Sequence, residues 1–500
     1  MSYTFFLLAV FTFQSLLCST FAQPVDVSVD AQVLIIGGGV DAIIAASTLN
    51  ENNITDFIIL EGSDHLHSHL KKITFAGLEF APGNLWGNSP AKATIQNFHE
   101  SNYSSYTVYT DEGDDITRVA IKRETDLVAA FNFSTEAIIG DIEEGARPDL
   151  SQKATLARGG WIATSAVDKV MEWFNFDFDE GRSARDISTI QAFRQNVLIG
   201  PEKYFLLGNR TALDRLASIL TEEQVRLNQR VRVVNQTEGF VRAVTEDGIE
   251  YTGNYTIVTS TVGVIQNGGI TFDPPLPPWK SEEFCRFQMG TIDPIFLKFD
   301  TKFWDDTEFI LHANDRHGYY PAFLNLEAEG LYPPGTNILI GFLTGEEAYR
   351  AELLTDDEVK AEILNVLRNI YGEDNVPDPV EFYMSRFATD PDLYGTFPTW
   401  PIGIIPEDAQ TRLRANVGRV YFAPEGAGNV EYIGIPRGSF RDGAAAAEAV
   451  IGCLLEDECD EYSPVEPGAP PLCQDVKPYN PNKRRKNFNV RLLSTEKKFE

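Results

Sequence analysis

The chain contains little cysteine, histidine or positive charge, and it lacks a long hydrophobic run after its first residues. Its 500 residues include 5 cysteines and 6 histidines, in no spacing that is typical of a zinc site, so we expect no metal centre. Lys and Arg number 42 against 73 Asp and Glu, which gives a net charge of −31. Such a surface repels nucleic acid and anionic lipid, and no later stretch reaches the roughly 18 apolar residues of a membrane-spanning helix. We therefore expect no nucleic-acid partner and no membrane anchor.

The first 22 residues have the pattern of a secretory signal peptide. An apolar run, Phe5–Leu17, precedes the small-residue site Thr20–Ala22, although no Lys or Arg stands before the run. N-x-S/T sequons, which are acceptors for N-glycosylation, begin at Asn53, Asn102, Asn132, Asn209, Asn235 and Asn254. The combination predicts a secreted, extracellular glycoprotein.

Removal of residues 1–22 would also remove Cys18. Cys453 and Cys459 are close enough in the chain to form a small disulfide, whereas Cys285 and Cys473 either pair or remain free. One short disulfide near the C-terminus is therefore expected.

The stretch from Gln32 to Glu61 carries the clearest pattern in the sequence. It reads VLIIGGG at 33–39, then an Ala- and Ile-rich run, then FIIL at 57–60. An apolar strand, a glycine turn, a helix and a second strand that ends in an acid form the dinucleotide-binding βαβ unit. The stretch therefore predicts a site for an adenine dinucleotide.

Four residues of this unit are candidate cofactor-binding residues. Gly37 permits the tight turn after the strand, and Gly39 lets backbone amides approach a pyrophosphate at the helix N-terminus, where the helix dipole favours negative charge. Ala42 occupies the position where a small residue lets helix and strand pack closely. Glu61 ends the second strand, within reach of a ribose 2′-hydroxyl.

Beyond this unit the sequence alternates between strand-like and helix-like regions. Residues 91–222 are mixed and helical, and residues 225–275 alternate polar and apolar residues between Gly and Asn turns. The clearest later elements are strands at 294–299 and 337–343 and a helix at 356–371. Residues 456–500 begin rich in proline and acid and carry the basic run Lys483–Lys486, so we expect a disordered tail.

Further motifs follow one another in the order found in one enzyme family. They are IIGGGVDAIIAASTL with ITDFIILEGSDHL (35–66), RLNQRVRVV (226–234), STVGVIQNGGITFDPPLPPWK (260–280), IFLKFDTKFW (295–304), DLYGTFPTWPIG (392–403) and GRVYFAPEGAG with YIGIPRGSFRDGAAAAEAV (418–450). With these motifs, about residues 31–455 resemble the flavin-dependent amine oxidases, in particular the secreted polyamine oxidases of plants and fungi. The resemblance implies FAD as cofactor and a small-molecule amine and O2 as substrates.

The same resemblance implies an α/β fold with two domains. A Rossmann-like FAD-binding domain of the GR2 type is expected from the discontinuous segments 31–90, 225–285 and 405–455. An α+β substrate-binding domain is expected from residues 91–224 and 286–404. A simple NAD-dependent dehydrogenase usually keeps its Rossmann half contiguous, and the similarity continues through the C-terminal flavin motif, so a dehydrogenase is disfavoured.

Carried over by position, the resemblance implies roles for four residues. Glu61 is expected to bind the adenosine ribose, and Val231 to contact the adenine through its backbone. Glu425 is expected beside the ribityl and pyrophosphate part of FAD. Trp400 is expected to form one wall of the reaction chamber, and the alternative for it is a buried structural tryptophan.

The sequence departs from the family pattern where the chemistry is expected. A Gly-Gly-Arg motif, whose arginine clamps the phosphates, is replaced by His67, Ser68 and His69. His69 can recover part of that contact when protonated, but it lacks the planar guanidinium fork. The lysine that holds a water at flavin N5 is replaced by Pro294, which has no side-chain donor and no backbone N–H. Lys298 lies on the same strand face but roughly 13 Å away, so it is no substitute.

The expected substrate contacts also differ from the family pattern. Ile435 replaces a tyrosine of the aromatic cage around the amine, and Asn88 replaces an acid at the tunnel mouth. Asp179 and Glu180 offer carboxylates nearby in the aligned chain, although either is also explained as a surface charge.

Two hypotheses about function follow. In the first, a secreted FAD-dependent oxidase converts an amine C–N bond to an imine while O2 is reduced to H2O2, with altered substrate or reduced activity. In the second, a secreted pseudoenzyme keeps the amine-oxidase fold as a scaffold, with FAD weakly held or absent. The sequence leaves the substrate and the oligomeric state open.

Overall fold

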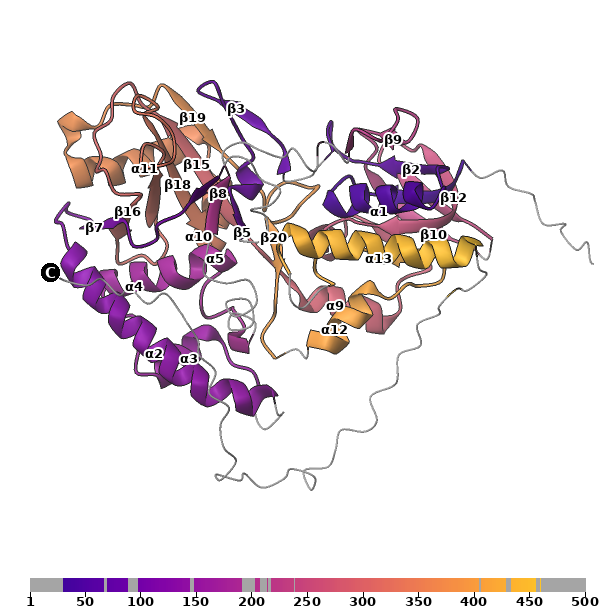
Figure 1. Cartoon of the computed structure of the whole chain (residues 1–500), viewed down its shortest axis with the longest axis horizontal. Coiled ribbons are helices and arrows are strands. Elements are labelled where there is room, and N and C mark those ends of the chain that lie inside the picture. The colour runs from indigo at the N-terminus through magenta and orange to yellow at the C-terminus, as the bar shows by residue number, and fades with distance from the viewer. Residues whose placement is uncertain are drawn as a thin grey trace, which may run out of the picture.

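The computed structural model describes residues 30–66, 70–88, 98–143, 148–190, 203–206, 214, 217–237, 239–403, 406–428, 433–455 and 459. These residues form two lobes, each built around one large sheet, and Figure 1 shows the lobes side by side. The expected signal peptide (1–22) and, apart from Cys459, the expected tail (456–500) lie outside the described residues. Both stay predictions.

The first lobe contains a sheet whose strands come from three separate parts of the chain. The strand order is β13-β10-β11-β12-β1-β2-β9, and β21 also pairs with β12. The strands are β1 (Ala31–Ile36), β2 (Phe57–Leu60), β9 (Val225–Arg226), β10 (Val231–Gln236), β11 (Val241–Thr245), β12 (Glu250–Val258), β13 (Thr271–Asp273) and β21 (Val420–Phe422). β1 is parallel to both of its neighbours, with Ile35 opposite Ile257 on β12 and Ile59 on β2. Parallel strands buried on both faces need continuous apolar sequence, which is what β1 and β2 have.

Helices cover both faces of this sheet. α1 (Val40–Glu51) and α13 (Pro436–Leu455) lie side by side on one face, as the indigo and yellow helices of Figure 1. Their shared core joins small helix residues to branched strand residues: Ala42, Ala45, Ala46, Ala446, Ala447, Val33, Ile35 and Ile59. The other face packs against α8 (Val262–Gln266), α9 (Pro278–Arg286) and α12 (Pro406–Arg414).

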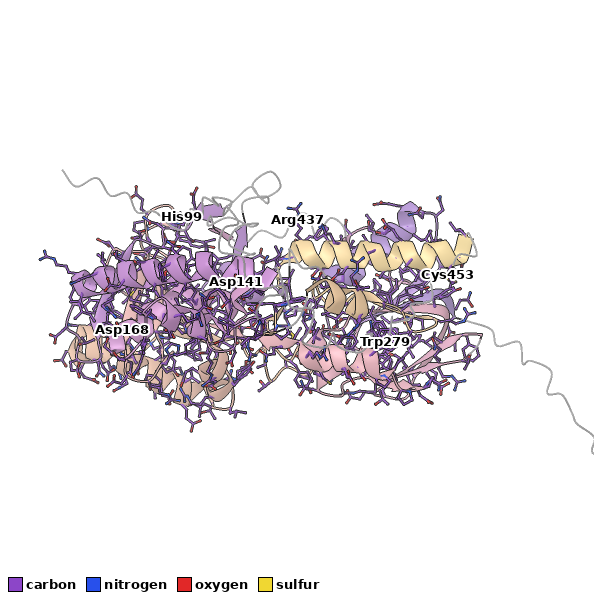
Figure 2. All side chains as sticks on the ribbon, turned by 90° about the horizontal axis from the view of Figure 1, so that it is seen from below. His99, Asp141, Asp168, Trp279, Arg437 and Cys453 are labelled. Atoms are coloured by element: carbon purple, nitrogen blue, oxygen red, sulfur yellow. A yellow bond between two sulfur atoms is a disulfide. The ribbon has the colours of Figure 1, made fainter. Side chains whose placement is uncertain are left out.

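The backbones of α1 and α13 touch at Gly443. A Cβ atom on Gly443 would lie 2.3 Å from the carbonyl oxygen of Asp41, which is too close for any side chain. Figure 2 shows α13 running from Arg437, near the junction of the lobes, to Cys453 at the outer end of the first lobe. Glycine at this position is therefore what allows the C-terminal helix to lie on the first turn of α1.

The expected disulfide lies at the end of α13. Cys453 and Cys459 are bonded, which confirms the pairing predicted from their spacing. Cys285 is exposed and free, and Cys473 lies outside the described residues.

The second lobe is built on a sheet with the strand order β19-β15-β18-β17-β16-β7. Its strands are β7 (Tyr106–Thr110), β15 (Ile292–Lys298), β16 (Phe309–Ala313), β17 (Ala322–Asn325), β18 (Ile338–Thr344) and β19 (Glu381–Met384). Adjacent strands are antiparallel except β7 and β16, which are parallel. α10 (Gly345–Glu352) and α11 (Asp356–Tyr371) cover one face, and α2 (Thr117–Glu143), α4 (Ala166–Glu172) and α5 (Phe178–Glu180) cover the other, with α3 (Gln152–Arg158) against α2. No helix in the described part of the chain is long and apolar enough to span a bilayer.

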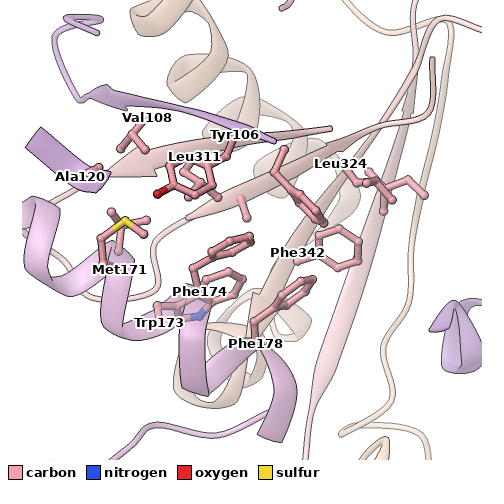
Figure 3. Close-up of a cluster of buried hydrophobic side chains, with 14 of the residues drawn as sticks. Tyr106, Val108, Ala120, Met171, Trp173, Phe174, Phe178, Leu311, Leu324 and Phe342 are labelled. Atoms are coloured by element: carbon pink, nitrogen blue, oxygen red, sulfur yellow. The ribbon is translucent and has the colours of Figure 1, made fainter. Parts of the chain in front are cut away.

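Aromatic side chains fill the space between this sheet and the helices α2 to α5. Figure 3 shows Trp173 and Phe174, from a π-helical turn (Trp173–Asp177), beside Phe178 and Phe342. The ring centroids of Phe178 and Phe342 are 5.0 Å apart. The indole N–H of Trp173 donates to the Thr344 hydroxyl at 2.8 Å. The buried indole therefore has the polar partner that it needs.

The amphipathic helix predicted at 356–371 is confirmed as α11. It begins with a capping box, in which the Thr355 side chain accepts from the Glu358 amide and Glu358 accepts from the Thr355 amide at 2.9 Å. Its buried residues recur at helical spacing: Val359, Ile363, Leu364, Val366, Leu367 and Ile370. The strands predicted at 294–299 and 337–343 are β15 and β18, each displaced by one or two residues.

Among the described residues, three small sheets complete the fold. They are β3 (Ile73–Phe75) with β4 (Leu78–Phe80), β8 (Lys203–Leu206) between β5 (Trp86–Asn88) and β6 (Phe98–Glu100), and β14 (Gln288–Gly290) with β20 (Phe397–Thr399). The predicted α/β class, with one sheet assembled from discontinuous segments, is confirmed. The residue boundaries of the two domains stay a prediction.

The contact between α1 and α13 makes a direct stability prediction. We expect Gly443→Ala to destabilise the protein by about 1–3 kcal/mol, because the added methyl group overpacks a backbone contact. Gly140→Ala is the matched control, since Gly140 lies in α2 with open space around its Cβ position; it should stabilise slightly, by about 0.5–1 kcal/mol. Thermal unfolding of both variants checks this, and equal midpoints would contradict the tight contact.

Candidate functional site

A cavity of about 720 Å³ begins at the turn between β1 and α1. Five of the residues predicted to bind the cofactor line it: Gly37, Gly39, Glu61, Val231 and Glu425. Its opposite wall is formed by residues 383–393, from β19 and the segment that follows it. The cavity therefore lies between the carboxyl ends of the first sheet's strands and a segment of the second lobe.

The turn itself depends on glycine. Gly37 has a φ of +106°, and a Cβ there would lie 2.5 Å from the Thr259 hydroxyl oxygen. A Cβ on Gly38 would lie 2.7 Å from a carboxylate oxygen of Glu61. Gly39 is the N-cap of α1 and has no side chain to occupy the first amides of the helix. Because Gly39 also lines the cavity, the N-terminus of α1 offers those amides as an anion-binding terminus at the cavity wall.

Glu61 stands at the end of β2, where the ribose-binding acid is predicted. Its side chain is buried, and one carboxylate oxygen accepts from the Ser63 amide at 2.7 Å. Burial raises the pKa of Glu61, and the hydrogen bonds from Ser63 offset part of that shift. Its ribose contact stays a prediction. Ala42, by contrast, does not reach the cavity: it is buried between α1, α13 and the sheet, the packing position expected for it.

An ion pair crosses from the first sheet to the segment after β19. Arg230, which directly precedes β10 and Val231, donates to both carboxylate oxygens of Asp392 at 2.6 Å. Both residues line the cavity. Sequence reasoning did not identify them, because no local pattern relates two residues separated by 162 positions. A bidentate pair of this kind fixes one wall of the cavity relative to the other.

Three acidic side chains surround the first turn of α1. Asp41 is fully buried, and its pKa is raised well above the usual value, first by burial and then by Glu425 and Asp442. Asp442, on α13, accepts from the Gly428 amide at 3.0 Å, and burial raises its pKa to about 6. Sequence reasoning passed over Asp41, although the signal was present as an acid within the glycine turn.

Pro294 lies in β15, opposite Phe342 on β18. The Pro294 carbonyl accepts from the Ser385 amide, just beyond the end of β19. Because the nitrogen and the carbonyl of one strand residue point to the same neighbouring strand, the Pro294 nitrogen is also on the β19 side. Its missing N–H thus falls where β19 has ended, which explains how proline fits a central strand. Lys298 does not approach this position, since its ammonium donates to the Thr336 carbonyl at 2.8 Å.

Trp400 and Ile435 do not line the 720 Å³ cavity. Trp400 is 2% exposed in the core under the first sheet, with the ring of Phe287 edge-on at 5.0 Å. Its indole N–H has no hydrogen-bond partner within the described part of the chain. Ile435 is half-buried directly before α13. Their roles in a reaction chamber stay predictions.

The predicted substrate and phosphate contacts are only partly described. Asn88 ends β5, but its side chain lies outside the described residues. Asp179 is exposed and Glu180 half-buried on α5, and neither lines the cavity. His67–His69 lie outside the described residues, so His69 as a phosphate ligand stays a prediction.

Comparison with known proteins decides the family. The family model for flavin containing amine oxidoreductases matches residues 146–451. The chain is 30% identical to polyamine oxidase 1 of Zea mays over 470 residues, which cover 86% of this chain and 92% of that protein. It is also 30% identical to polyamine oxidase 7 of Oryza sativa subsp. japonica, over 83% of this chain and 94% of the relative. The chain belongs to the flavin containing amine oxidoreductase family.

Solved structures of putrescine oxidase share the fold of this amine oxidoreductase. The wild-type enzyme bound to putrescine superposes with a TM-score of 0.65 at 18% identity, over 84% of this chain and 99% of that one. A double mutant of putrescine oxidase, from a structure-based redesign of cofactor binding, gives a TM-score of 0.66 at 19% identity, over 85% and 99%. The enzyme class, an FAD-dependent oxidoreductase acting on amines, follows from the family.

The residues of the cavity fit the nucleotide part of FAD. The glycine turn and Glu61 together line the cavity, and a side chain at Gly37 or Gly38 would clash with Thr259 or Glu61 and so displace this wall. The phosphate part is bounded by Asp41 and Glu425, so the fit there depends on the charge of these acids. Within the described residues, no three His, Cys, Asp or Glu side chains are grouped to hold a metal ion.

The position of Glu61 predicts a measurable loss of FAD binding on substitution. We expect Glu61→Ala to weaken FAD affinity by about 10- to 100-fold, the effect of removing a charged hydrogen-bond acceptor. Glu79→Ala on the exposed face of β4 is the control and should bind FAD as the unmodified protein does. Equilibrium dialysis with free FAD gives both affinities, and unchanged affinity of the folded Glu61→Ala protein would contradict the ribose contact.

Proposed function

We propose that this chain is a secreted FAD-dependent oxidase of small cationic amines, with a polyamine-like donor. One observation carries the proposal: a single cavity joins the dinucleotide turn, Glu61 and Glu425 to a wall from the second lobe. Residues of the glycine turn would hold the nucleotide part of FAD, and residues from the second lobe line the same cavity. The similarity to two plant polyamine oxidases over more than 90% of their length supports the donor class.

The reaction follows from the cofactor that the site fits. Bound FAD supplies two-electron chemistry, in which the carbon next to the amine nitrogen loses a hydride and O2 is reduced to H2O2. The imine product then hydrolyses. The protein positions the donor, excludes water and keeps the amine deprotonated, and the acidic surface raises the local concentration of a cationic substrate.

We further propose that turnover is reduced or the donor altered. Pro294 offers no side-chain donor where the family places a lysine, and Lys298 is bonded to the Thr336 carbonyl instead. Ile435 cannot donate a hydrogen bond or an aromatic face to an amine. These differences leave orientation by the cavity walls as the main contribution of the protein.

A specific observation also favours the second candidate, a catalytically impaired scaffold. Asp41 adds a buried carboxyl group to the phosphate end of the cavity, at the same time as Pro294 removes the lysine. If Asp41 excludes FAD, the amine-oxidase fold remains without its chemistry. The first candidate is preferred because the glycine turn and Glu61 are intact.

Two features of the described residues support secretion, in addition to the signal peptide expected from the sequence. The Cys453–Cys459 disulfide suits an oxidising compartment. The sequon residues Asn53 and Asn102 are exposed, so both are accessible to N-glycosylation.

The visible spectrum and peroxide production separate the two candidates. Protein purified from the culture medium of a secreting host should show flavin bands near roughly 375 and 450 nm and should release peroxide with spermidine or spermine. Flavin bands without peroxide from any amine would favour the scaffold with retained FAD. Absent bands at pH 5 and at pH 8 would exclude the oxidase.

Restoring the family residues should rescue turnover only in combination. Pro294→Lys returns the missing donor, and His67→Gly, Ser68→Gly and His69→Arg together return the phosphate clamp. The combined variant should raise peroxide production by more than the two sets do separately, because positioning and proton chemistry act together. Rates measured with spermidine for all three variants check this. If the unmodified protein already turns over at about 1–10³ per second, the range of ordinary enzymes, the reduced-activity proposal is wrong.

A further inference from the structure

Asp41 is the one acid among the described residues that lies in the first turn of α1, directly after the glycine turn of the dinucleotide site. It is the second residue of α1, two positions after Gly39, and it lines the cavity. Its side chain is fully buried, and neither carboxyl oxygen has a hydrogen-bond partner of normal geometry among the described residues. Asp41 thus places a buried, unpartnered carboxyl group at the helix N-terminus of the cavity, where a pyrophosphate would be held.

The charged groups that face Asp41 are both acidic. Glu425 approaches from the turn after β21, and Asp442 approaches from α13. From α13 the Ser439 hydroxyl also lies near, and Gly443 packs on the Asp41 backbone. The guanidinium of Arg414 is 4.0 Å from Asp442 and is partly exposed, so it stabilises that carboxylate rather than Asp41. No basic side chain among the described residues is paired with Asp41.

Asp442 and Asp41 differ in the groups that stabilise their ionised forms. Asp442 accepts from the Gly428 amide and lies near Arg414, both of which favour its ionised form. Asp41 has no comparable stabilisation, and burial together with two acidic neighbours raises its pKa well above the usual value. When a proton is shared within this group, Asp41 is the residue that holds it.

A bound pyrophosphate adds negative charge to this group. An ionised Asp41 would repel it, whereas a protonated Asp41 is neutral and has an O–H to donate. We propose that Asp41 is a further cofactor-binding residue of this chain, which holds FAD only in its protonated form, so that FAD binding and proton uptake are coupled. The inference rests on the FAD assignment above and adds a condition to it.

The sign of the pH dependence follows from this coupling. Below the pKa of Asp41 in the FAD-free protein, the carboxyl group is already protonated and affinity is greatest. Above that pKa, Asp41 must take up a proton from solvent when FAD binds, so the dissociation constant of FAD rises by up to about tenfold for each pH unit. The rise ends when the pH passes the still higher pKa of Asp41 beside the bound phosphates.

The test measures FAD affinity of the mature, full-length protein by equilibrium dialysis between pH 5 and pH 9, with flavin absorbance as readout. The unmodified protein should show the rise in dissociation constant. Asp41→Asn should remove most of it and should bind FAD more tightly than the unmodified protein at pH 9, by about the factor through which the dissociation constant of the unmodified protein has risen between pH 5 and pH 9. Glu51→Gln, at the exposed end of the same helix, is the matched control and should keep the rise.

Two further variants separate Asp41 from other titrating groups. His69→Gln should keep most of the pH dependence, whereas its loss in this variant together with its retention in Asp41→Asn would overturn the proposal. Loss of the pH dependence in Asp442→Asn, with retention in Asp41→Asn, would place the proton on Asp442 and would also overturn the proposal. If Asp41→Asn does not fold, calorimetry of FAD binding to the unmodified protein in two buffers of different ionisation enthalpy still decides, because net proton uptake on FAD binding is expected over the pH range in which the dissociation constant rises.

The remaining outcomes distinguish this proposal from the function proposed above. FAD binding with equal affinity from pH 5 to pH 9 would overturn the role of Asp41 and leave the oxidase intact. Absence of FAD binding at every pH, in both the unmodified and the Asp41→Asn protein, would overturn both.

Discussion

The backbone contact between α1 and α13 is the constraint on which the cofactor site depends. Because Gly443 has no side chain, the C-terminal helix lies directly on Asp41 and buries it. The same helix presents Asp442 to the Gly428 amide and so fixes the turn that begins at Glu425. Asp41 and Glu425, which both line the cavity, are thus held in place by the C-terminal helix.

Much of this arrangement could be predicted from sequence, because the deciding patterns are local. A glycine turn between two apolar strands specifies the βαβ unit within about thirty residues. Helix α11 carries its own cap at Thr355 and its own apolar stripe. The order of the motifs along the chain then placed both in the amine oxidoreductase family.

Contacts between distant segments could not be predicted in this way. Arg230 and Asp392 are joined only by the three-dimensional fold. Asp41 was visible in the sequence, but its importance comes from burial beneath α13 and from acids on two other elements. Proline is disfavoured in a central strand, and only the end of β19 explains how Pro294 is accommodated in β15.

The late position of β21 and α13 in the chain has a consequence for biosynthesis. A nascent polypeptide can pair β1 with β2 and fold most of the second lobe before Val420 is made. It still lacks β21, which pairs with the C-terminal end of β12, and α13, the helix that packs on α1. The partly synthesised chain therefore exposes the apolar faces of α1 and of the first sheet, and it has no closed dinucleotide pocket. FAD loading should accordingly follow completion of the chain, which makes cofactor supply in the compartment where folding ends a condition for a functional product.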